Sequence, residues 1–489
     1  MTDRLIPMPM AFKAAMDAQP DALMLTVDEQ SWTRRQLFER AVAFAHEFRD
    51  RGVEPGQIVS ILLPNCHDFI AAAIGAHMVA ATPQPLSVSM AHRELLEILE
   101  ISDPAVVVAA EGGPSIDREK VLVHRVRERS GEEVPEEFLT AVSKEWKAPT
   151  SGGSTGRPKV IVSAAPALID PEDQALYSLT RLPLDSAVVI PGPLYHNGPF
   201  TFGLYALIRR NHLLLSTRFD AERTLAQIDR FDASYLYAVP TMMLRIARLP
   251  QEVLDAYDLS TLKALMHLGA PCPAWLKELW MGWLGDDALL ELYGGTEQQA
   301  NAVITGSEWR TRQGSVGKAV AGAFKIVRDD GTEADPCEVG EIYLHTGSPE
   351  RVTYRYIGAE PKVVDGGWET LGDIGWMDAD GYLYLLEKRA DLILRGGANI
   401  YPAEIEAALE EHPLVMSSAV VGLPDEDLGQ RVHAIVQTEA ELGEEELLEH
   451  LRDRLSRNKH PQSFEFVSEP IRDDSGKVRR SKLRDERSA

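Results

Sequence analysis

A ten-residue stretch at residues 150–159 combines hydroxyls, glycines and two cations, which are the groups that bind polyphosphates. Glycines let the backbone approach an anion and adopt positive φ, successive N–H groups form an anion-binding nest, and hydroxyls with Lys159 meet the outer oxygens. The stretch is not a Walker A loop, because Arg157 and Pro158 separate Gly156 from Lys159. Taken alone, it is equally typical of a mobile linker.

Residues 292–297 form a second candidate, because they place an aromatic, two glycines, a hydroxyl and a carboxylate at the end of a predicted buried strand. Magnesium binds proteins through one or two carboxylates plus substrate phosphates, so the single carboxylate of Glu297 could hold Mg²⁺. A strand-end turn with an exposed glutamate is the ordinary alternative.

Two later motifs add a carboxylate and a lysine. Asp373, in the Gly-Asp-Ile-Gly-Trp run that starts at Gly372, is the right kind of group to accept both hydroxyls of a ribose. Lys477 lies in a turn at residues 474–480, near the end of the chain, where a flexible tip could present it. The basic run at residues 477–487 is otherwise typical of a solvated face, so we assign no function to its members other than Lys477.

The elements that position these groups alternate between amphipathic or apolar helices and buried strands. We expect helices at 31–52, 68–79, 92–101, 241–249 and 274–281, and strands at 58–63, 106–108, 234–239, 262–268 and 289–293. This rhythm predicts βα units on a mainly parallel sheet, in which ligands bind at the loops after the carboxyl ends of the strands.

Beyond about residue 340 the expected strands become shorter and the alternation of strand and helix ends. We expect short strands at 341–345 and 382–386, then a helix at 402–411, strands at 418–421 and 432–437, and a helix at 444–455. The first two predict a small β subdomain, and the rest predict an α+β unit of roughly one hundred residues that starts near Ala390. The predicted fold class is therefore α/β: a large N-terminal domain of parallel-rich βα sheets with a small β subdomain, and a small α+β C-terminal domain.

Size, charge and cysteine content narrow the class of protein. A chain of 489 residues is too long for one ordinary core, so two or three domains are expected. The net charge of −25 disfavours nucleic acid as a partner, and an anionic nucleotide must be met by a local basic pocket. Three cysteines without CxxC spacing argue against a disulfide framework and a zinc site. With no signal pattern and no apolar run long enough for a membrane span, we expect a cytoplasmic enzyme.

The joint order of the motifs is far more specific than any one of them. With the cradle at 150–159, the turn at 292–297, Gly372-Asp373, the segment at 396–406 and Ser475-Gly476-Lys477, the chain resembles the adenylate-forming superfamily of acyl-CoA synthetases, peptide-synthetase adenylation domains and firefly-type luciferases. The resemblance runs from roughly residue 10 to residue 486. It implies a large domain at 1–389 and a mobile domain at 390–489 that rotates between two half-reactions, with the hinge at our independent boundary.

The resemblance also implies roles for individual residues. Those that hold the β- and γ-phosphates are Ser151, Ser154, Thr155, Gly156 and Lys159. Those around the rest of the nucleotide are Gly269, Ala270 and Pro271 beside adenine, Tyr293 stacked on it, Gly294 next along the chain, Thr296 on the α-phosphate, Glu297 on Mg²⁺ and Asp373 on the ribose. Lys477 would bridge the acid's carboxylate and the α-phosphate, and would stabilise charge that builds on the phosphoryl oxygens.

Further residues concern the second half-reaction and the acid. Gly396 and Gly397 would border a channel in which a thiol attacks the acyl adenylate, because glycine leaves room for a pantetheine arm. Lys388 sits where a ribose-contacting arginine is typical and Arg389 is its neighbour, while Ala390 occupies the hinge position; Lys and Arg are not equivalent in fork geometry. His196 would lie near the acid's carboxylate, or would be a structural histidine.

The sequence thus predicts an ATP- and Mg²⁺-dependent carboxylic acid ligase that makes an acyl adenylate and then an acyl-CoA thioester, as a monomer or homodimer. Tyr195, Phe200 and Phe202 could line a site for a cyclic or medium-sized hydrophobic acid, or could belong to the core. The alternatives are capture of the adenylate by an amine, an enzyme that performs one half-reaction, and a silent acyl-nucleotide sensor. The presence of both Lys477 and Glu297 counts against the sensor.

Overall fold

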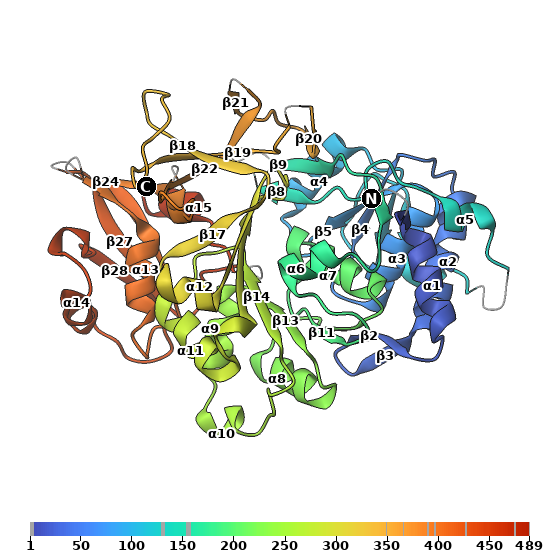
Figure 1. Cartoon of the computed structure of the whole chain (residues 1–489), viewed down its shortest axis with the longest axis horizontal. Helices are drawn as coiled ribbons and strands as arrows, with labels where there is room; N and C mark the ends of the chain where they lie inside the picture. The colour runs from blue at the N-terminus through green and yellow to red at the C-terminus, as the bar shows by residue number, and fades with distance from the viewer. Residues whose placement is uncertain are drawn as a thin grey trace.

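The computed structural model describes residues 4–128, 133–152, 158–348, 350–364, 366–388, 391–395, 398–425, 428–473 and 476–488. The N-terminal part of the chain lies at one end of the molecule and the C-terminal part at the other, with the green and yellow middle of the chain between them (Figure 1). The predicted α/β class is confirmed, and so are the expected helices and strands, apart from shifts at their ends.

A four-stranded parallel sheet is the first layer of the N-terminal part. Its strands are β4 (Ile58–Leu62), β5 (Thr82–Leu86), β6 (Val106–Ala109) and β7 (Lys120–Leu122), in the order β5-β4-β6-β7. Its helices are α2 (Arg34–Asp50), α3 (His67–Met78) and α4 (His92–Ser102). The helix expected from residue 31 begins at Arg34, because Ser31 belongs to strand β3 (Gln30–Thr33) and Thr33 caps the helix in a capping box with Gln36.

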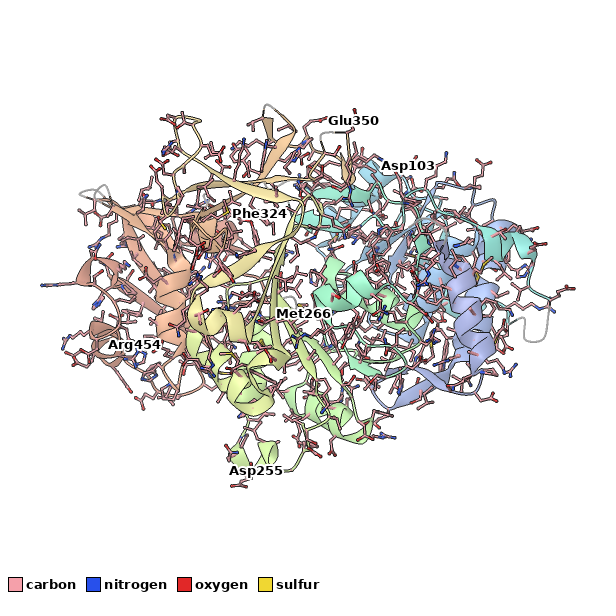
Figure 2. All side chains as sticks on the ribbon, in the orientation of Figure 1. Asp103, Asp255, Met266, Phe324, Glu350 and Arg454 are labelled. Atoms are coloured by element: carbon pink, nitrogen blue, oxygen red, sulfur yellow. The ribbon has the colours of Figure 1, made fainter. Side chains whose placement is uncertain are left out.

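The second sheet carries the βα units that the motifs follow. Six parallel strands lie side by side in the order β15-β14-β13-β11-β12-β2. They are β2 (Leu23–Val27), β11 (Ala187–Val189), β12 (His212–Leu215), β13 (Tyr235–Ala238), β14 (Ala264–Leu268) and β15 (Leu289–Gly294), with helices α7 (Asn197–Ile208), α8 (Ala221–Arg230), α9 (Pro240–Ala247) and α11 (Ala274–Leu284). Met266 on β14 is fully buried near the middle of the molecule (Figure 2).

The predicted β subdomain continues this sheet instead of forming a separate one. Antiparallel strands extend it beyond β15: β16 (Asn301–Thr305), β17 (Ser315–Ala321), β23 (Leu383–Lys388), β22 (Trp368–Met377), β19 (Gly340–His345) and β18 (Ala323–Val327). A core of its own, which includes Phe324 and Ile342, packs beneath these strands.

A small sheet of β8 (Thr150–Gly152), β9 (Pro158–Ser163) and β20 (Tyr354–Ile357) frames the predicted phosphate loop. The remaining elements of the N-terminal part are β1 (Ile6–Pro7), α1 (Met8–Ala18), α5 (Glu136–Thr140), β10 (Leu168–Ile169), α6 (Gln174–Thr180), α10 (Gln251–Leu254), α12 (Gly306–Thr311) and β21 (Val363–Val364).

The C-terminal α+β unit has the expected elements. They are β24 (Ile393–Arg395), β25 (Ala398–Ile400), α13 (Pro402–Glu410), β26 (Ser417–Asp425), β27 (Gly429–Gln437), α14 (Glu444–Arg452), β28 (Ser463–Val467) and α15 (Arg480–Arg487). Ile405, Leu409, Val432 and Leu447 lie in its separate hydrophobic core. Residues 389 and 390 lie outside the described part, so the boundary near Ala390 stays a prediction. Within the described ranges, no helix combines the length and apolar character needed to cross a bilayer.

Candidate active site

The carboxyl ends of β13, β14 and β15 bring several predicted site residues to one edge of the sheet. Gly269, with Ala270 and Pro271 directly after it, follows β14, and Tyr293 and Gly294 end β15. Gly269 has φ +88°, and a Cβ there would lie 3.7 Å from Cγ1 of Val239, which follows β13. This is the edge at which parallel α/β sheets bind ligands.

Tyr293 is joined to the predicted ribose residue. Its hydroxyl donates a hydrogen bond of 2.7 Å to Oδ2 of Asp373, which lies on β22. Burial raises the pKa of Tyr293 well above its usual value, and the Asp373 carboxylate raises it further, so Tyr293 remains a donor. In the strand register Asp373 is opposite Lys388 on β23, whose side chain lies outside the described part. The backbone therefore places Lys388 opposite Asp373, the predicted ribose ligand. The resemblance to adenylate-forming enzymes likewise implied a position near the ribose for Lys388.

Glu297 forms the second half of the site. It is only 5% exposed, so the alternative of an exposed strand-end glutamate does not apply. Its Oε1 accepts a 2.6 Å hydrogen bond from the Tyr356 hydroxyl and lies 3.4 Å from Nζ of Lys159. The Lys159 ammonium also lies 3.8 Å from the centre of the Tyr356 ring. Lys159, the predicted phosphate ligand, and Glu297, the candidate metal ligand, thus both contact Tyr356 of β20.

The two glycines between Tyr293 and Thr296 leave no room for a side chain. A Cβ on Gly294 would lie 2.2 Å from Oδ1 of Asn301, and one on Gly295 would lie 2.8 Å from Oε2 of Glu297. The second contact shows that the Glu297 carboxylate lies against the backbone of this turn. Thr296 itself is half-buried.

Glu297 suits Mg²⁺ in a site shared with substrate phosphates. Among the residues that the structure describes, no group of three or more His, Cys, Asp or Glu side chains gathers as a self-sufficient metal site. A single buried carboxylate beside the phosphate loop fits a hard cation that takes most of its other ligands from phosphate and water.

His196 lies directly before α7, on the loop that follows β11. Asn65 holds this loop: its Nδ2 donates to the carbonyls of Gly192 and Ser216, and its Oδ1 accepts the N–H of Leu194 at 2.8 Å. The first turn of α7 packs on β13 so closely that a Cβ on Gly198 would lie 2.0 Å from the Tyr237 hydroxyl. His196 is therefore held at the same sheet edge as the nucleotide candidates.

The aromatics proposed around the acid divide into two groups. Phe200 is fully buried and Phe202 is 8% exposed, and both belong to the main hydrophobic core. Tyr195 is half-buried, and its ring lies 4.6 Å from that of His196. Phe200 and Phe202 thus follow the core alternative, while Tyr195 stays a candidate for the acid site.

A buried lysine links the phosphate loop to α7. Lys147 is 1% exposed, and its ammonium donates to Oδ1 of Asn197 at 2.6 Å and to Oγ1 of Thr201 at 2.8 Å, with the Trp146 ring at 4.3 Å. Burial lowers its pKa to about 7. Lys147 therefore ties the segment just before β8, the strand that precedes the predicted phosphate loop, to the N-terminal part of α7.

Gly476 and Lys477 of the C-terminal unit, together called the Lys477 tip, lie at the same sheet edge. Gly476 has φ +78°, and a Cβ there would lie 2.4 Å from Oγ1 of Thr241 and 3.2 Å from Cγ2 of Val239. The turn is closed by a pair of 3.0 Å bonds between Asp473 and Lys477. Lys477 is exposed and lies directly after a glycine packed against Val239, the residue that also faces Gly269.

The basic run after Lys477 is not entirely a solvated face. Arg480, at the start of α15, donates to both oxygens of buried Glu406 at 2.9 and 2.7 Å and to Asp391 at 3.2 Å. The expectation that this run is a solvated face was therefore wrong for Arg480, and also for Arg487, which pairs with Glu465. A regular charge pattern does not reveal that two acidic residues from distant segments lie opposite it.

Several predicted site residues lie outside the described part of the chain: Ser154, Thr155, Gly156, Arg389, Gly396 and Gly397. For Ser151 only the backbone, in β8, is described. Their assigned roles stay predictions. The residues that sequence reasoning missed are Asn65, Lys147, Tyr237 and Tyr356, and each acts through a contact with a segment far away in the chain.

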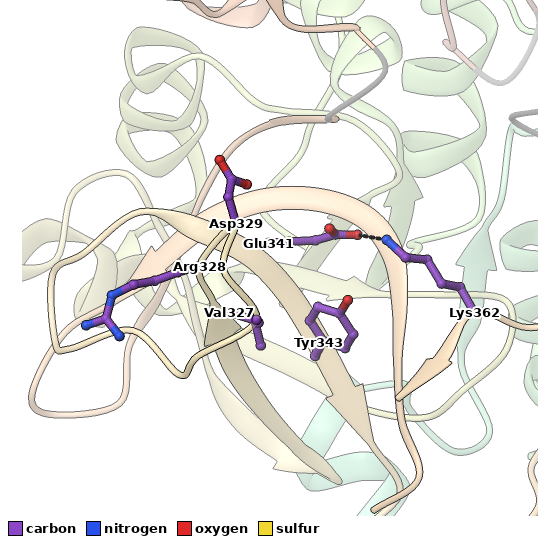
Figure 3. A pocket seen from close by; sticks show the side chains of 7 residues that line it. Val327, Arg328, Asp329, Glu341, Tyr343 and Lys362 are labelled. Carbon is purple, nitrogen blue, oxygen red and sulfur yellow. Dashed lines mark hydrogen bonds and ion pairs between the residues drawn. The ribbon is translucent and has the colours of Figure 1, made fainter. Parts of the chain in front are cut away.

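A hollow of about 260 Å³ lies in the β subdomain, apart from the sheet edge described above (Figure 3). Glu341 in its wall accepts a 3.0 Å bond from Lys362 and a 2.9 Å bond from Thr370, whose hydroxyl in turn accepts the N–H of Gly372. Glu341 and Lys362 pair with each other, Arg328 pairs with Glu338 and Asp335 outside the hollow, and the wall supports the turn before Asp373.

The fold and the site define an α/β enzyme that meets a nucleoside triphosphate at the carboxyl edge of a parallel sheet. The family model for AMP-binding enzymes matches residues 12–351, and the model for their C-terminal domain matches residues 404–477. The chain belongs to the AMP-binding enzyme family, so the resemblance to adenylate-forming enzymes is confirmed.

Similar proteins include several CoA ligases. The chain is 28% identical to a 2-succinylbenzoate–CoA ligase of Bacillus licheniformis, over 96% of this chain and 98% of the relative. It is 27% identical to a methyl-dioxo-octahydroindenyl-propanoyl:CoA ligase of Rhodococcus jostii, over the full length of both. The structure of o-succinylbenzoate CoA synthetase from Bacillus subtilis with its acyl-adenylate intermediate has the same fold, with a TM-score of 0.82 at 24% identity over 99% of both chains.

Proposed function

We propose that this chain is an ATP- and Mg²⁺-dependent acid–CoA ligase, which forms an acyl adenylate and then transfers the acyl group to the thiol of CoA. The observation that carries the proposal is the seat of the Lys477 tip against Val239, beside Gly269 and the strand ends that hold Tyr293 and Glu297. A lysine from one domain and a polyphosphate site on another are what an in-line attack on an α-phosphate requires.

In the first half-reaction the acid's carboxylate attacks the α-phosphorus of ATP, and pyrophosphate leaves. Negative charge builds on the phosphoryl oxygens during this attack, and the Lys477 ammonium stabilises it without reorganising solvent. Lys159 binds the outer phosphates, and Asp373, oriented by the Tyr293 hydroxyl at 2.7 Å, accepts the ribose hydroxyls. Mg²⁺, held by Glu297, would neutralise phosphate charge when bound.

In the second half-reaction the thiol of CoA attacks the acyl carbon, and AMP leaves. The domain at 390–489 rotates about a hinge near Ala390 between the two steps, so that Lys477 withdraws and Gly396 and Gly397 border the thiol channel. Support for separate movement is the hydrophobic core that the C-terminal unit has of its own.

The acid contains a ring. The two relatives named above are ligases of ring-containing acids, a succinylbenzoate and an octahydroindenyl propanoate. The half-buried Tyr195, whose ring lies tilted beside that of His196 with 4.6 Å between the ring centres, supports a ring at the acid site. The enzyme works in the cytoplasm, and support for a reducing compartment is that Cys66, Cys272 and Cys337 are all free.

The experiment incubates the protein with ATP, Mg²⁺ and a library of cyclic, aromatic and linear acids, with and without CoA, and measures AMP, pyrophosphate and acyl products by mass. We expect AMP and an acyl-CoA for ring-containing acids. CoA-independent AMP release that requires an added amine, with an amide as product, would replace the thioester proposal. No pyrophosphate from any acid would reject adenylation altogether.

A further inference from the structure

The Lys477 tip touches the start of helix α9, while the same helix binds the C-terminal unit at its other end. At the start, Gly476 packs against Thr241 and Val239. At the end, Arg248, which follows α9, donates a 2.8 Å hydrogen bond from Nη2 to the main-chain carbonyl of Glu410, the last residue of α13. The C-terminal unit is thus docked at the start of α9 and directly after its end.

Arg472 joins the two docking points inside the C-terminal unit. Its Nη1 donates to the carbonyl of Gly476 at 3.3 Å, and its Nη2 donates to Oε1 of Glu410 at 3.1 Å. Further bonds to the carbonyl of Ser418 at 3.1 Å and to the hydroxyl of Ser417 at 3.0 Å fix the plane of the guanidinium. The planar guanidinium of Arg472 therefore links the Lys477 tip to the C-terminal end of α13, which Arg248 contacts.

Stability alone is a poor explanation for this arrangement. The side chains of Arg472 and Glu410 are 12% and 9% exposed, and a buried ion pair is often no more stabilising than apolar residues of the same size. What such a pair provides is geometry, because the guanidinium fork sets both the distance and the angle between its partners.

We propose that Arg472 is a positioning residue for Lys477: it transmits the docking of α13 on α9 to the lysine tip, so that the ammonium reaches the α-phosphate only while both docking points are made. This inference rests on the proposed function for its catalytic consequence, but its structural part concerns the seat of the tip alone. It predicts that Arg472 acts in adenylate formation and not in transfer to CoA, because Lys477 serves only the first step.

The test compares Arg472→Met with Arg487→Met, a matched control. Arg487 also lies in the C-terminal unit and forms a two-bond pair with Glu465, at 2.6 and 2.7 Å, but it does not belong to the contacts around the tip. We expect Arg472→Met to lower the rate of adenylate formation about 10²-fold, the cost of a misplacement on the order of 1 Å. Thioester formation from supplied acyl adenylate should stay within about twofold, and Arg487→Met should spare both steps.

Two further variants separate positioning from a loss of folding. Arg472→Lys should not restore activity, because an ammonium cannot replace the fork. Combined with Lys477→Ala, Arg472→Met should cause no further loss, since the group that it positions is already absent. A full additional loss in that background, an equal loss in both half-reactions, or an unaffected single variant would overturn the inference.

A readout that needs no activity distinguishes this inference from the proposed function. In the double variant Thr241→Cys with Gly476→Cys, mild oxidation of the full chain should form a disulfide across the seat of the tip, detected by peptide mass. Adding Arg472→Met should slow this cross-linking several-fold, whereas adding Arg487→Met should not. Unchanged cross-linking would reject the role of Arg472. Slowed cross-linking in a chain that makes no adenylate would reject the proposed function and leave the docking role standing.

Discussion

Replacing Lys147 by Met removes a buried cation whose proton affinity is changed by folding. Burial lowers the pKa of its ammonium from 10.5 to about 7. In the unfolded chain the amine regains its ordinary pKa of about 10.4. Between about pH 7 and pH 10.5 the unfolded state therefore binds this proton more tightly than the folded state does. The free energy of unfolding rises with pH across this window, because the buried amine becomes neutral while its unfolded counterpart stays charged.

The size of the effect follows from the same two values. One bound proton contributes about 1.4 kcal/mol per pH unit, so the whole window amounts to something on the order of 5 kcal/mol. Lys147→Met has no such proton and should lose this rise. It also leaves Asn197 and Thr201 without their donor, at a cost of about 1 to 3 kcal/mol that does not change with pH. The variant should therefore fall further behind the wild type as the pH increases.

The assay is chemical denaturation of the wild type and Lys147→Met at unit steps from about pH 7 to pH 10, read as the difference between their unfolding free energies. Lys263→Met is the control, because Lys263 is exposed and its ammonium donates a 3.0 Å bond to the carbonyl of Ser260 at the surface. It should follow the wild type at every pH. A constant difference between the wild type and Lys147→Met over this range would refute a buried ammonium at this position.

Other substitutions test the site directly. Lys477→Ala should lower adenylate formation by about 10² to 10³, as expected for losing one transition-state donor, while thioester formation from supplied acyl adenylate persists; stopped-flow measurement of each half-reaction would contradict this by showing an equal loss. Tyr356→Phe removes one hydrogen bond from Glu297, worth about 1 to 3 kcal/mol for a charged acceptor, and should raise the Mg²⁺ concentration needed for half-maximal activity; an unchanged Mg²⁺ titration would argue against Glu297 as its ligand. Gly198→Ala should destabilise the protein by about 1 to 3 kcal/mol through overlap with the Tyr237 hydroxyl, and Tyr237→Phe in the same chain should recover much of it in a melting experiment; a double variant as unstable as the single one would show that the clash lies elsewhere.

The parts of the site that were predicted from sequence are those whose chemistry is local in the chain. Glu297 follows two glycines at a strand end, and Gly476 precedes Lys477 in a short turn, so residue type and spacing reveal them. The apolar runs likewise predicted β14, which ends just before Gly269, and β15, which contains Tyr293, because burial of a parallel strand is a local property of its residues.

The missed residues are those whose partners are distant in sequence. Tyr356 bonds a residue 59 positions away, Lys147 one 50 positions away and Asn65 one 129 positions away. None of them stands in a distinctive local pattern, since a lone Tyr, Lys or Asn between apolar residues is consistent with many environments. Their roles arise only when the sheet brings its loops together.

One continuous ribbon of hydrogen-bonded strands carries both acidic groups of the nucleotide site. Glu297 lies in the loop between β15 and β16. Asp373 lies on β22, and β17 and β23 separate β22 from β16 in the sheet. The main-chain bonds between these strands fix the register of Asp373 relative to the strands on either side of the Glu297 loop, so we expect the two acidic candidates to keep a constant spacing. In the proposed reaction, movement between the two half-reactions would then belong to the C-terminal unit. This unit would leave its contacts with α9 without changing the positions of Glu297 and Asp373.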